Sequence, residues 1–269
     1  MEENVVIENK KEFYYYVPMT LNKELDIKNA INNVILDAID NNYSLCFGNI
    51  STEMLNVFNN DYSDIFHTEN IRNYSDYIYN SSDLINLSGK KFHKKKNLIN
   101  KFKREYEGRW QYKSVEQDDF EDILRFNRFW CDNNLSKDIE DMYDETVAIK
   151  SALKNFHTLN MKGGMLLLDG EIIAYTLGCE STKDVFVIQI EKALSSFVGA
   201  YQMINNLFAS CEAGNYKYIN REEDLGIEGI RKAKMSYNPV FMEEYYVASA
   251  KLNKRGVIKL PVFKMNVIE

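Results

Sequence analysis

The sequence predicts an α/β protein made of two domains. Of its 269 residues, 45% are apolar and 13% aromatic, with only three prolines and twelve glycines, so the chain has enough apolar side chains to bury a core. Apolar and aromatic runs typical of strands alternate with segments of helical periodicity. One strongly basic segment, residues 89–109, separates two acidic parts, and we therefore expect domains over residues 1–88 and 110–269.

The first 88 residues are acidic and have the pattern of a small α/β unit. Apolar residues at helical spacing predict a helix over residues 27–39. Ser51 has the side chain of a helix N-cap and Glu53 suits a first turn, so a second helix is expected to begin at this point. Strands are expected at residues 13–17, 43–48 and 76–80.

The basic segment is predicted to be a helix with one apolar face. Its net charge is +7, and its lysines fall outside the face that is formed by Phe92, Ile99, Phe102 and Tyr106. Two interpretations remain open: a solvated helix that connects the domains, or a platform for the phosphates of a nucleotide cofactor, an RNA or an anionic lipid. One basic helix in an acidic protein fits a local anion site better than a coat for nucleic acid.

The second domain has the expected element order β-α-α-β-β-β-α-β-α-β. Asp169-Gly170 between two apolar runs is a strong signal for a two-residue hairpin. The strands are expected at 110–115, 164–168, 171–178, 184–190, 216–220 and 243–250, and the helices at 118–133, 144–159, 198–213 and 224–234.

Several classes of protein are excluded by what the sequence lacks. Four cysteines without a CxxC pair and three scattered histidines indicate neither a disulfide framework nor a metal site, and we interpret the cysteines as buried thiols. No Walker A loop, GxGxxG after a strand, HExxH or GxSxG occurs. The acidic start lacks the features of a signal peptide and no apolar run could span a bilayer, so we expect a cytoplasmic protein.

The order of elements in the second domain resembles the acyltransferase fold of the Gcn5-related N-acetyltransferase (GNAT) superfamily. In that fold an antiparallel meander meets a parallel pair of strands, which here would be residues 184–190 and 216–220, joined by a right-handed helical crossover. Because ligands bind outside the carboxyl ends of parallel strands, we expect the functional site directly after these two segments.

Five stretches of sequence look like those of the phosphatidylglycerol lysyltransferase C-terminal-like family. They are SDYIY (75–79), LSGKKFHKKKNLINKF (87–102), EKAL (191–194), GAYQMIN (199–205) and YINREEDLGIEGIRKAK (218–234). The resemblance implies a bacterial protein with two tandem GNAT-like domains, each a mixed sheet flanked by helices. It also implies a relation to enzymes that transfer an aminoacyl group from tRNA to a lipid or to a peptidoglycan precursor.

The expected donor follows from a departure from the acetyltransferase pattern. Acetyl-coenzyme A enzymes of the superfamily bind pyrophosphate at a basic, glycine-rich turn before a helix, but residues 195–201 keep only Gly199-Ala200 and no basic side chain. We therefore prefer aminoacyl-tRNA to acyl-coenzyme A as donor. Its phosphates would meet the basic helix at Lys94, Lys95, Lys96 and Asn97. A coenzyme A-dependent acetyltransferase and a non-catalytic ligand-binding protein remain alternatives.

The charged residues after the two strands are the candidates for catalysis. Glu191, Glu222 and Asp224 can supply the base that acyl transfer needs. Arg221 can clamp a carboxylate or phosphate, and the candidates for further substrate binding are Asn220, Tyr201 and Gln202. The structural alternative is that Asp224 caps the following helix and that Arg221 and Glu191 form a salt bridge between the strands.

Overall fold

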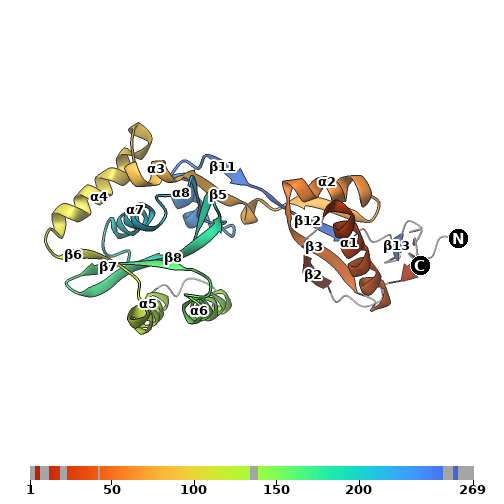
Figure 1. Ribbon diagram of the computed structural model, residues 1–269, viewed down its shortest axis with the longest axis horizontal. Coiled ribbons are helices and arrows are strands. Elements are labelled where there is room, and N and C mark those ends of the chain that lie inside the picture. The colour runs from red at the N-terminus through yellow and green to blue at the C-terminus, as the bar shows by residue number, and fades with distance from the viewer. Residues whose placement is uncertain are drawn as a thin grey trace. The chain divides into compact units, whose positions relative to one another are not determined.

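A computed structural model describes residues 4–6, 12–18, 23–41, 43–133, 139–250 and 257–259. The chain forms two compact units: Met1–Ser75 together with Glu243–Glu269, and the continuous stretch Asp76–Met242. Figure 1 shows the elements of both. Each unit has its own sheet and its own hydrophobic core, so each is a domain in its own right.

The first unit contains a four-stranded sheet of order β2-β3-β12-β4. Strand β3 runs parallel to β2 and antiparallel to β12, which also pairs antiparallel with β4. The strands are β2 (Glu12–Tyr16), β3 (Ser44–Ser51), β4 (Phe66–Asn70) and β12 (Tyr245–Ala250), and a separate antiparallel pair consists of β1 (Asn4–Val6) and β13 (Val257–Lys259).

Two helices supply the rest of the first core. Helix α1 (Lys23–Asp40) contributes Ile31 and Ile35, and α2 (Thr52–Asp61) contributes Phe58; all three side chains are buried with the apolar residues of β3. The predicted cap is confirmed, because the Ser51 hydroxyl accepts a hydrogen bond from the backbone N–H of Met54 at 3.3 Å. A short 3₁₀ turn, η1 (Arg72–Tyr74), follows β4.

The second unit is built on a seven-stranded mixed sheet of order β11-β5-β10-β9-β8-β7-β6. Its meander β6 to β9 is antiparallel, whereas β9 and β10 are parallel, as the resemblance implied. The strands are β5 (Asp76–Asn80), β6 (Trp110–Ser114), β7 (Lys162–Leu168), β8 (Glu171–Thr182), β9 (Val185–Ala193), β10 (Tyr218–Asn220) and β11 (Phe241–Glu243).

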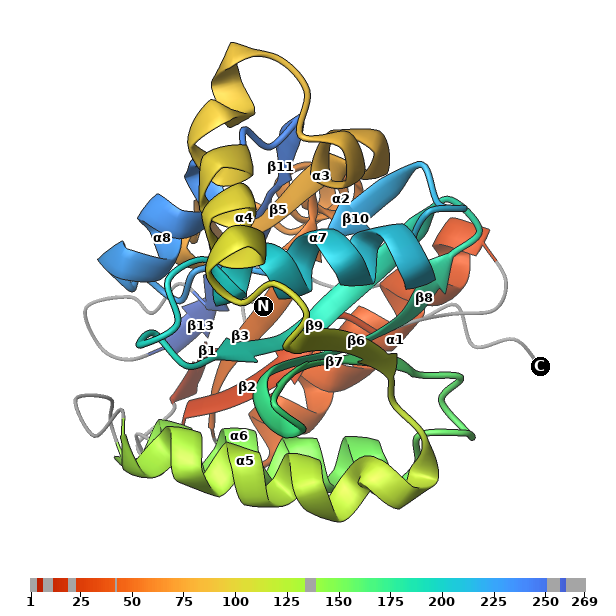
Figure 2. The ribbon, with the colours of Figure 1, turned by 90° about the vertical axis from the view of Figure 1, so that its left-hand side faces the viewer.

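Helices cover both faces of this sheet, as Figures 1 and 2 show. One face packs against α3 (Ser81–Asn86), α4 (His93–Glu105) and α7 (Ala200–Glu212), and the other against α5 (Phe120–Asp132) and α6 (Ile139–Lys154). Helix α8 (Glu228–Met235) follows β10, and two 3₁₀ turns, η2 (Lys90–Phe92) and η3 (Gln117–Asp119), precede α4 and α5. No helix in these described ranges is long and apolar enough to cross a bilayer.

The hairpin between β7 and β8 forms where the sequence predicts it. Asp169 and Gly170 have φ values of 51° and 90°, the left-handed conformation that a tight two-residue turn between twisted strands needs. Glycine adopts it without strain, and aspartate tolerates it better than most residues.

The division into domains differs from the predicted boundaries at residues 88 and 110. Strand β5, expected in the first domain, pairs antiparallel with β10 in the second unit, and β12, expected in the second domain, lies between β3 and β4 in the first. The basic helix is α4, an integral part of the second unit rather than a connection. Most residues of β5 are buried, so this strand has to lie in a sheet that is covered on both faces. No local pattern in the sequence reveals which of the two sheets that is.

The four cysteines are free thiols, as expected, but they are not all buried. Cys46 is buried, Cys131 and Cys179 are partly exposed, and Cys211 is exposed. Cys211 lies in the last turn of α7, between the polar residues Ser210 and Glu212.

A close contact between α4 and α7 supports a stability prediction. Gly199, with φ of 98°, precedes α7, and a Cβ atom there would lie 2.6 Å from the Leu98 carbonyl oxygen of α4. We expect Gly199→Ala to destabilise the protein by about 1–3 kcal/mol, because it adds both backbone strain and a clash with main chain. Thermal unfolding checks this, with Gly229→Ala in open space on α8 as the control; equal melting temperatures for the two variants would contradict it.

Candidate active site

The candidate site lies where the two parallel strands separate. Strand β10 pairs with β9 only from Tyr218 to Asn220, opposite Val185 to Val187. Strand β9 continues to Ala193, paired with β8. Beyond Val187, the edge of β9 therefore faces the loop that follows β10. The carboxyl ends of both strands contribute side chains to the site between them.

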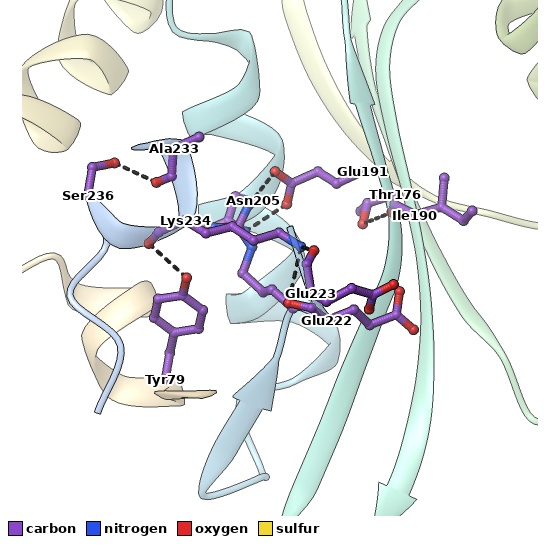
Figure 3. A network of polar contacts seen from close by, with 11 residues as sticks. Tyr79, Thr176, Ile190, Glu191, Asn205, Glu222, Glu223, Ala233, Lys234 and Ser236 are labelled. Atoms are coloured by element: carbon purple, nitrogen blue, oxygen red, sulfur yellow. Dashed lines mark hydrogen bonds and ion pairs between the residues drawn. The ribbon is translucent and has the colours of Figure 1, made fainter. Parts of the chain in front are cut away.

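A buried ion pair joins the two strand ends. Arg221, the first residue after β10, donates from Nη2 to Oε1 of Glu191 on β9 at 2.8 Å, and the side chains are only 10% and 11% exposed. Oε2 of Glu191 accepts a hydrogen bond from Asn205 of α7 at 2.7 Å, the contact visible in Figure 3. The salt bridge that the sequence allowed as the structural alternative is thus present.

Two tyrosines and a lysine surround the Arg221 guanidinium. Its Cζ lies 4.9 Å from the ring centroid of Tyr237 and 5.8 Å from that of Tyr79, within the range of cation–π attraction. Nζ of Lys95, from α4, lies 4.1 Å from the Tyr237 ring centroid. Burial and the nearby guanidinium lower the pKa of Lys95 to about 8.

Lys234, in the last turn of α8, approaches the same place. Its ammonium donates to the backbone carbonyls of Glu222, at 3.1 Å, and of Glu223. Burial and Arg221 lower the pKa of Lys234 to about 8. The carboxyl groups of Glu223, Glu222 and Glu191 act on the Lys234 ammonium in the opposite direction, without forming an ion pair with it in the described structure.

Among the described residues, Glu222 is the carboxyl group whose pKa is raised the most. Burial, then the neighbouring Glu223 and Asp76 carboxylates, raise the pKa of Glu222 to about 8. Figure 3 shows the Glu222 and Glu223 carboxyl groups lying beside each other and away from Glu191. The main chain of Glu222 has φ of 54°, and its N–H donates to Oδ1 of Asn220 at 2.7 Å while Asn220 donates to Asp76 at 2.7 Å.

Asp224 holds the loop rather than facing the open side of the site. It is fully buried and accepts hydrogen bonds from the Tyr77 hydroxyl at 2.5 Å, from Gly226 N–H at 2.8 Å, and from two nitrogens of Arg231 at 2.8 Å each. The Arg231 guanidinium is the main reason that the pKa of Asp224 lies well below its usual range. A saturated, permanently ionised carboxylate suits a structural role more than that of a base.

The other predicted binding residues are placed differently. Lys95 of the basic helix reaches the cluster, whereas Lys94, Lys96 and Asn97 are exposed to solvent. Tyr201 and Gln202, in the first turn of α7, are partly buried. The pKa of Tyr201 is raised, mainly by burial.

Several residues at the site were not predicted from the sequence. They come from elements other than the two strand ends: Asp76 and Tyr79 of β5, Asn205 of α7, Lys234 of α8 and Tyr237 just beyond it. A signal was present, since all of these except Tyr237 lie within the stretches on which the family resemblance rests. In the described ranges, no three His, Cys, Asp or Glu side chains converge as metal ligands.

Comparison with known proteins identifies the family. Residues 5–249 match the family described as phosphatidylglycerol lysyltransferase, C-terminal. An uncharacterized protein of Mycoplasmoides gallisepticum is 27% identical over 185 residues, which cover 64% of this chain and 55% of the relative. The matched region thus spans about half the length of that curated relative.

Solved structures show the same fold. A conserved protein of unknown function from Bacteroides thetaiotaomicron has a TM-score of 0.81 at 38% identity, covering 88% of this chain and 79% of that one. L-PGS from Bacillus licheniformis has a TM-score of 0.60 at 15% identity, covering 92% and 83%. The expected GNAT-like α/β fold with two mixed sheets is therefore confirmed. Because the match extends over most of its length, this chain belongs to the phosphatidylglycerol lysyltransferase C-terminal family.

Proposed function

We propose that the second unit is an aminoacyltransferase that uses aminoacyl-tRNA as donor, with Glu222 as the general base. The observation that carries the proposal is a carboxyl group with a pKa near 8 at the parting of β9 and β10, in a chain of the lysyltransferase family. A base whose pKa lies close to the working pH is the most effective in proton transfer.

In the proposed reaction, a hydroxyl or amine of the acceptor attacks the ester carbonyl carbon of the aminoacyl-tRNA. Glu222 accepts the proton of the attacking group, the bond between the carbonyl carbon and the terminal ribose oxygen breaks, and the protonated Glu222 returns the proton to that oxygen. The products are the aminoacylated acceptor and deacylated tRNA, and the base is regenerated. Glu191, neutralised by Arg221 and held by Asn205, has a positioning role, and Asp224 fixes the loop.

The surroundings of α7 favour tRNA over coenzyme A as donor. The amino end of this helix, where acetyltransferases of the superfamily bind pyrophosphate, lies against the Leu98 carbonyl of α4. It also has no side-chain cap and no basic residue in its first turn. A pyrophosphate at this place would have to displace α4, whereas the exposed lysines of that helix remain open to tRNA phosphates.

A transfer assay tests the proposal. Aminoacyl-tRNA labelled in the amino acid is incubated with the purified protein and with phosphatidylglycerol vesicles or a peptidoglycan precursor, and label in the acceptor and deacylated tRNA are measured. We expect equal amounts of both products. Micromolar binding of acetyl-coenzyme A with release of free thiol would contradict the proposal and establish an ordinary acetyltransferase, and binding without turnover would establish a ligand-binding protein.

The basic helix should supply a salt-dependent part of tRNA affinity. We expect the double charge reversal Lys94→Glu with Lys96→Glu to weaken tRNA binding and to reduce the slope of log K against log salt by about 1.4–1.8, because two phosphate contacts are lost. Filter binding over a salt series measures this. Lys150→Glu with Lys154→Glu, which reverses two exposed charges on α6, is the matched control, and an equal effect of both double variants would disprove a specific role for α4.

A further inference from the structure

We propose that Arg221, Lys95 and Lys234 form a subsite for a singly charged oxoanion of the acceptor, either a phosphodiester or a carboxylate. The inference deepens the proposed function, because the site that it assigns would hold the acceptor next to Glu222. It rests on three features: convergence of cations from separate elements, lack of matching negative charge, and a buried donor without an acceptor.

Three segments that are distant in the sequence bring their cations together. Lys95 comes from α4, Arg221 from the end of β10 and Lys234 from α8. The guanidinium of Arg221 lowers the pKa of both ammonium groups. The Tyr237 ring contacts both Lys95 and Arg221. Cations repel one another, so an arrangement that collects three of them in a largely buried place costs stability unless an anion joins them.

The protein itself supplies too little negative charge. Glu191 is the carboxylate that pairs with Arg221, and both of its oxygens are already in hydrogen bonds. Among the residues with described positions, no carboxylate lies within ion-pair distance of Lys95 or Lys234. Glu222 is largely protonated at neutral pH, and Glu223 acts on Lys234 without forming an ion pair with it. Against three cations, Glu191 and Glu223 supply two negative charges, so one positive charge is left over.

One donor of Arg221 also lacks a partner. Its Nη1 is buried and makes no hydrogen bond to any residue of the described chain. The whole side chain is nine-tenths buried. Leaving a charged donor buried and unsatisfied is costly, and such groups in native proteins commonly mark a missing ligand or ion. An oxoanion beside Arg221 would accept from Nη1 and would neutralise the remaining positive charge.

The protonation of the lysines supports this assignment. Both have pKa values near 8 because they are buried near Arg221, and a bound anion would raise both values. The other groups that face them are Glu191 of β9, Glu222 and Glu223 of the loop, Tyr77 and Tyr79 of β5, and Tyr237 beyond α8. At about pH 8, binding of an anion should therefore be coupled to proton uptake by Lys95 and Lys234.

Calorimetric titration of the full chain, without tRNA or acceptor, tests the proposal. Dimethyl phosphate represents a phosphodiester and acetate a carboxylate, and each is titrated at about pH 8 in two buffers that differ in ionisation enthalpy. We expect saturable binding of at least one probe with net proton uptake, and the stronger probe identifies the class of acceptor group. Absence of binding of both probes, or binding without proton uptake, would overturn the subsite.

Variants locate the binding. We expect Lys95→Gln and Arg221→Gln each to weaken binding of the probe roughly 10- to 100-fold, the loss that one charge-assisted hydrogen bond represents. Lys232→Gln is the control, since its side chain lies on α8 but is exposed and pairs with Glu228. If Arg221→Gln fails to fold, the affinity of Lys95→Gln for the probe tests the proposal alone. This variant is expected to fold, because Lys95 forms no ion pair in the described structure. An unchanged affinity in Lys95→Gln would overturn the proposal.

Failure of the subsite and failure of the proposed function are distinguishable. Probe binding without aminoacyl transfer would retain the oxoanion subsite and reject the transferase. Transfer in the absence of probe binding, with an unchanged KM for the acceptor in Lys95→Gln, would retain the transferase and reject the subsite.

Discussion

Replacement of Glu222 by glutamine should reduce the rate of aminoacyl transfer by about 10²- to 10⁴-fold, the usual contribution of a general base. Glutamine preserves the size of the side chain, and the backbone contacts of this residue with Asn220 and Lys234 do not involve the carboxyl group. The loss should appear in kcat, with the affinity for aminoacyl-tRNA unchanged. A variant that retains more than a tenth of the activity would remove Glu222 from the mechanism.

The pH dependence of transfer should report the same group. Because burial and nearby carboxylates raise the pKa of Glu222 to about 8, the base form increases as the pH rises through that value, and kcat at saturating acceptor should rise with it. Glu223→Gln is the informative control, since it removes one of the causes of the raised pKa. We expect this variant to remain active, and we expect its transfer rate to rise at a lower pH than that of the natural protein. An unshifted profile would show that another group titrates.

Stability offers a readout of Glu222 that requires no substrate. The folded protein binds the Glu222 proton up to about pH 8, whereas an unfolded chain releases it near pH 4.3. Between these values the folded state holds more protons, so the contribution of Glu222 to stability falls as the pH rises. The melting temperature of Glu222→Gln should therefore exceed that of the natural protein by more at about pH 8 than at about pH 5.

The sequence predicted those parts of the fold that depend on local pattern. The Asp169-Gly170 hairpin, the Ser51 cap and the β5 segment have unambiguous local signals, and the structure contains all three. The exchange of β5 and β12 between the sheets has no such signal, because either strand could complete either sheet by composition. The sheet that a strand joins depends on where its two side-chain faces become buried. That depends on the fully folded chain and not on the local sequence.

The same distinction applies to the candidate site. Glu191, Arg221 and Glu222 were predictable because the carboxyl ends of two parallel strands meet at one edge. Lys234 and Tyr237 lie in and just beyond a helix whose position above that edge no periodicity reveals, and Tyr79 arrives with a strand that was expected in the other domain. Three adjacent lysines of the basic helix looked equivalent in the sequence, but only Lys95 points into the cluster.

Asp224 shows how residue type alone can mislead. It follows the candidate base by two residues and shares its chemistry, yet its hydrogen bonds with Tyr77, Gly226 and Arg231 mark it as the anchor of the loop. Glu222 and Leu225 on either side of it have φ values of 54° and 51°, a left-handed conformation that costs non-glycine residues about 1–3 kcal/mol each unless the surroundings enforce it. The backbone of Glu222 is held by Asn220, Lys234 and the N–H of Tyr77, and the contacts of Asp224 with Tyr77 and Arg231 hold the turn that follows.

Replacement of Asp224 by alanine should consequently destabilise the protein by about 1–3 kcal/mol, because the Tyr77 hydroxyl and the Gly226 N–H lose this buried acceptor, and should inactivate the site as the loop relaxes. Denaturant unfolding measures the change. Asp122→Ala is the matched control, because it breaks an exposed aspartate–arginine pair, with Arg125, worth less than about 1 kcal/mol. Since Arg231 lowers the pKa of Asp224, its contribution is complete above about pH 4 and declines only in stronger acid. A loss in Asp224→Ala no larger than in Asp122→Ala would show that the loop is held by Lys234 and Asn220 instead.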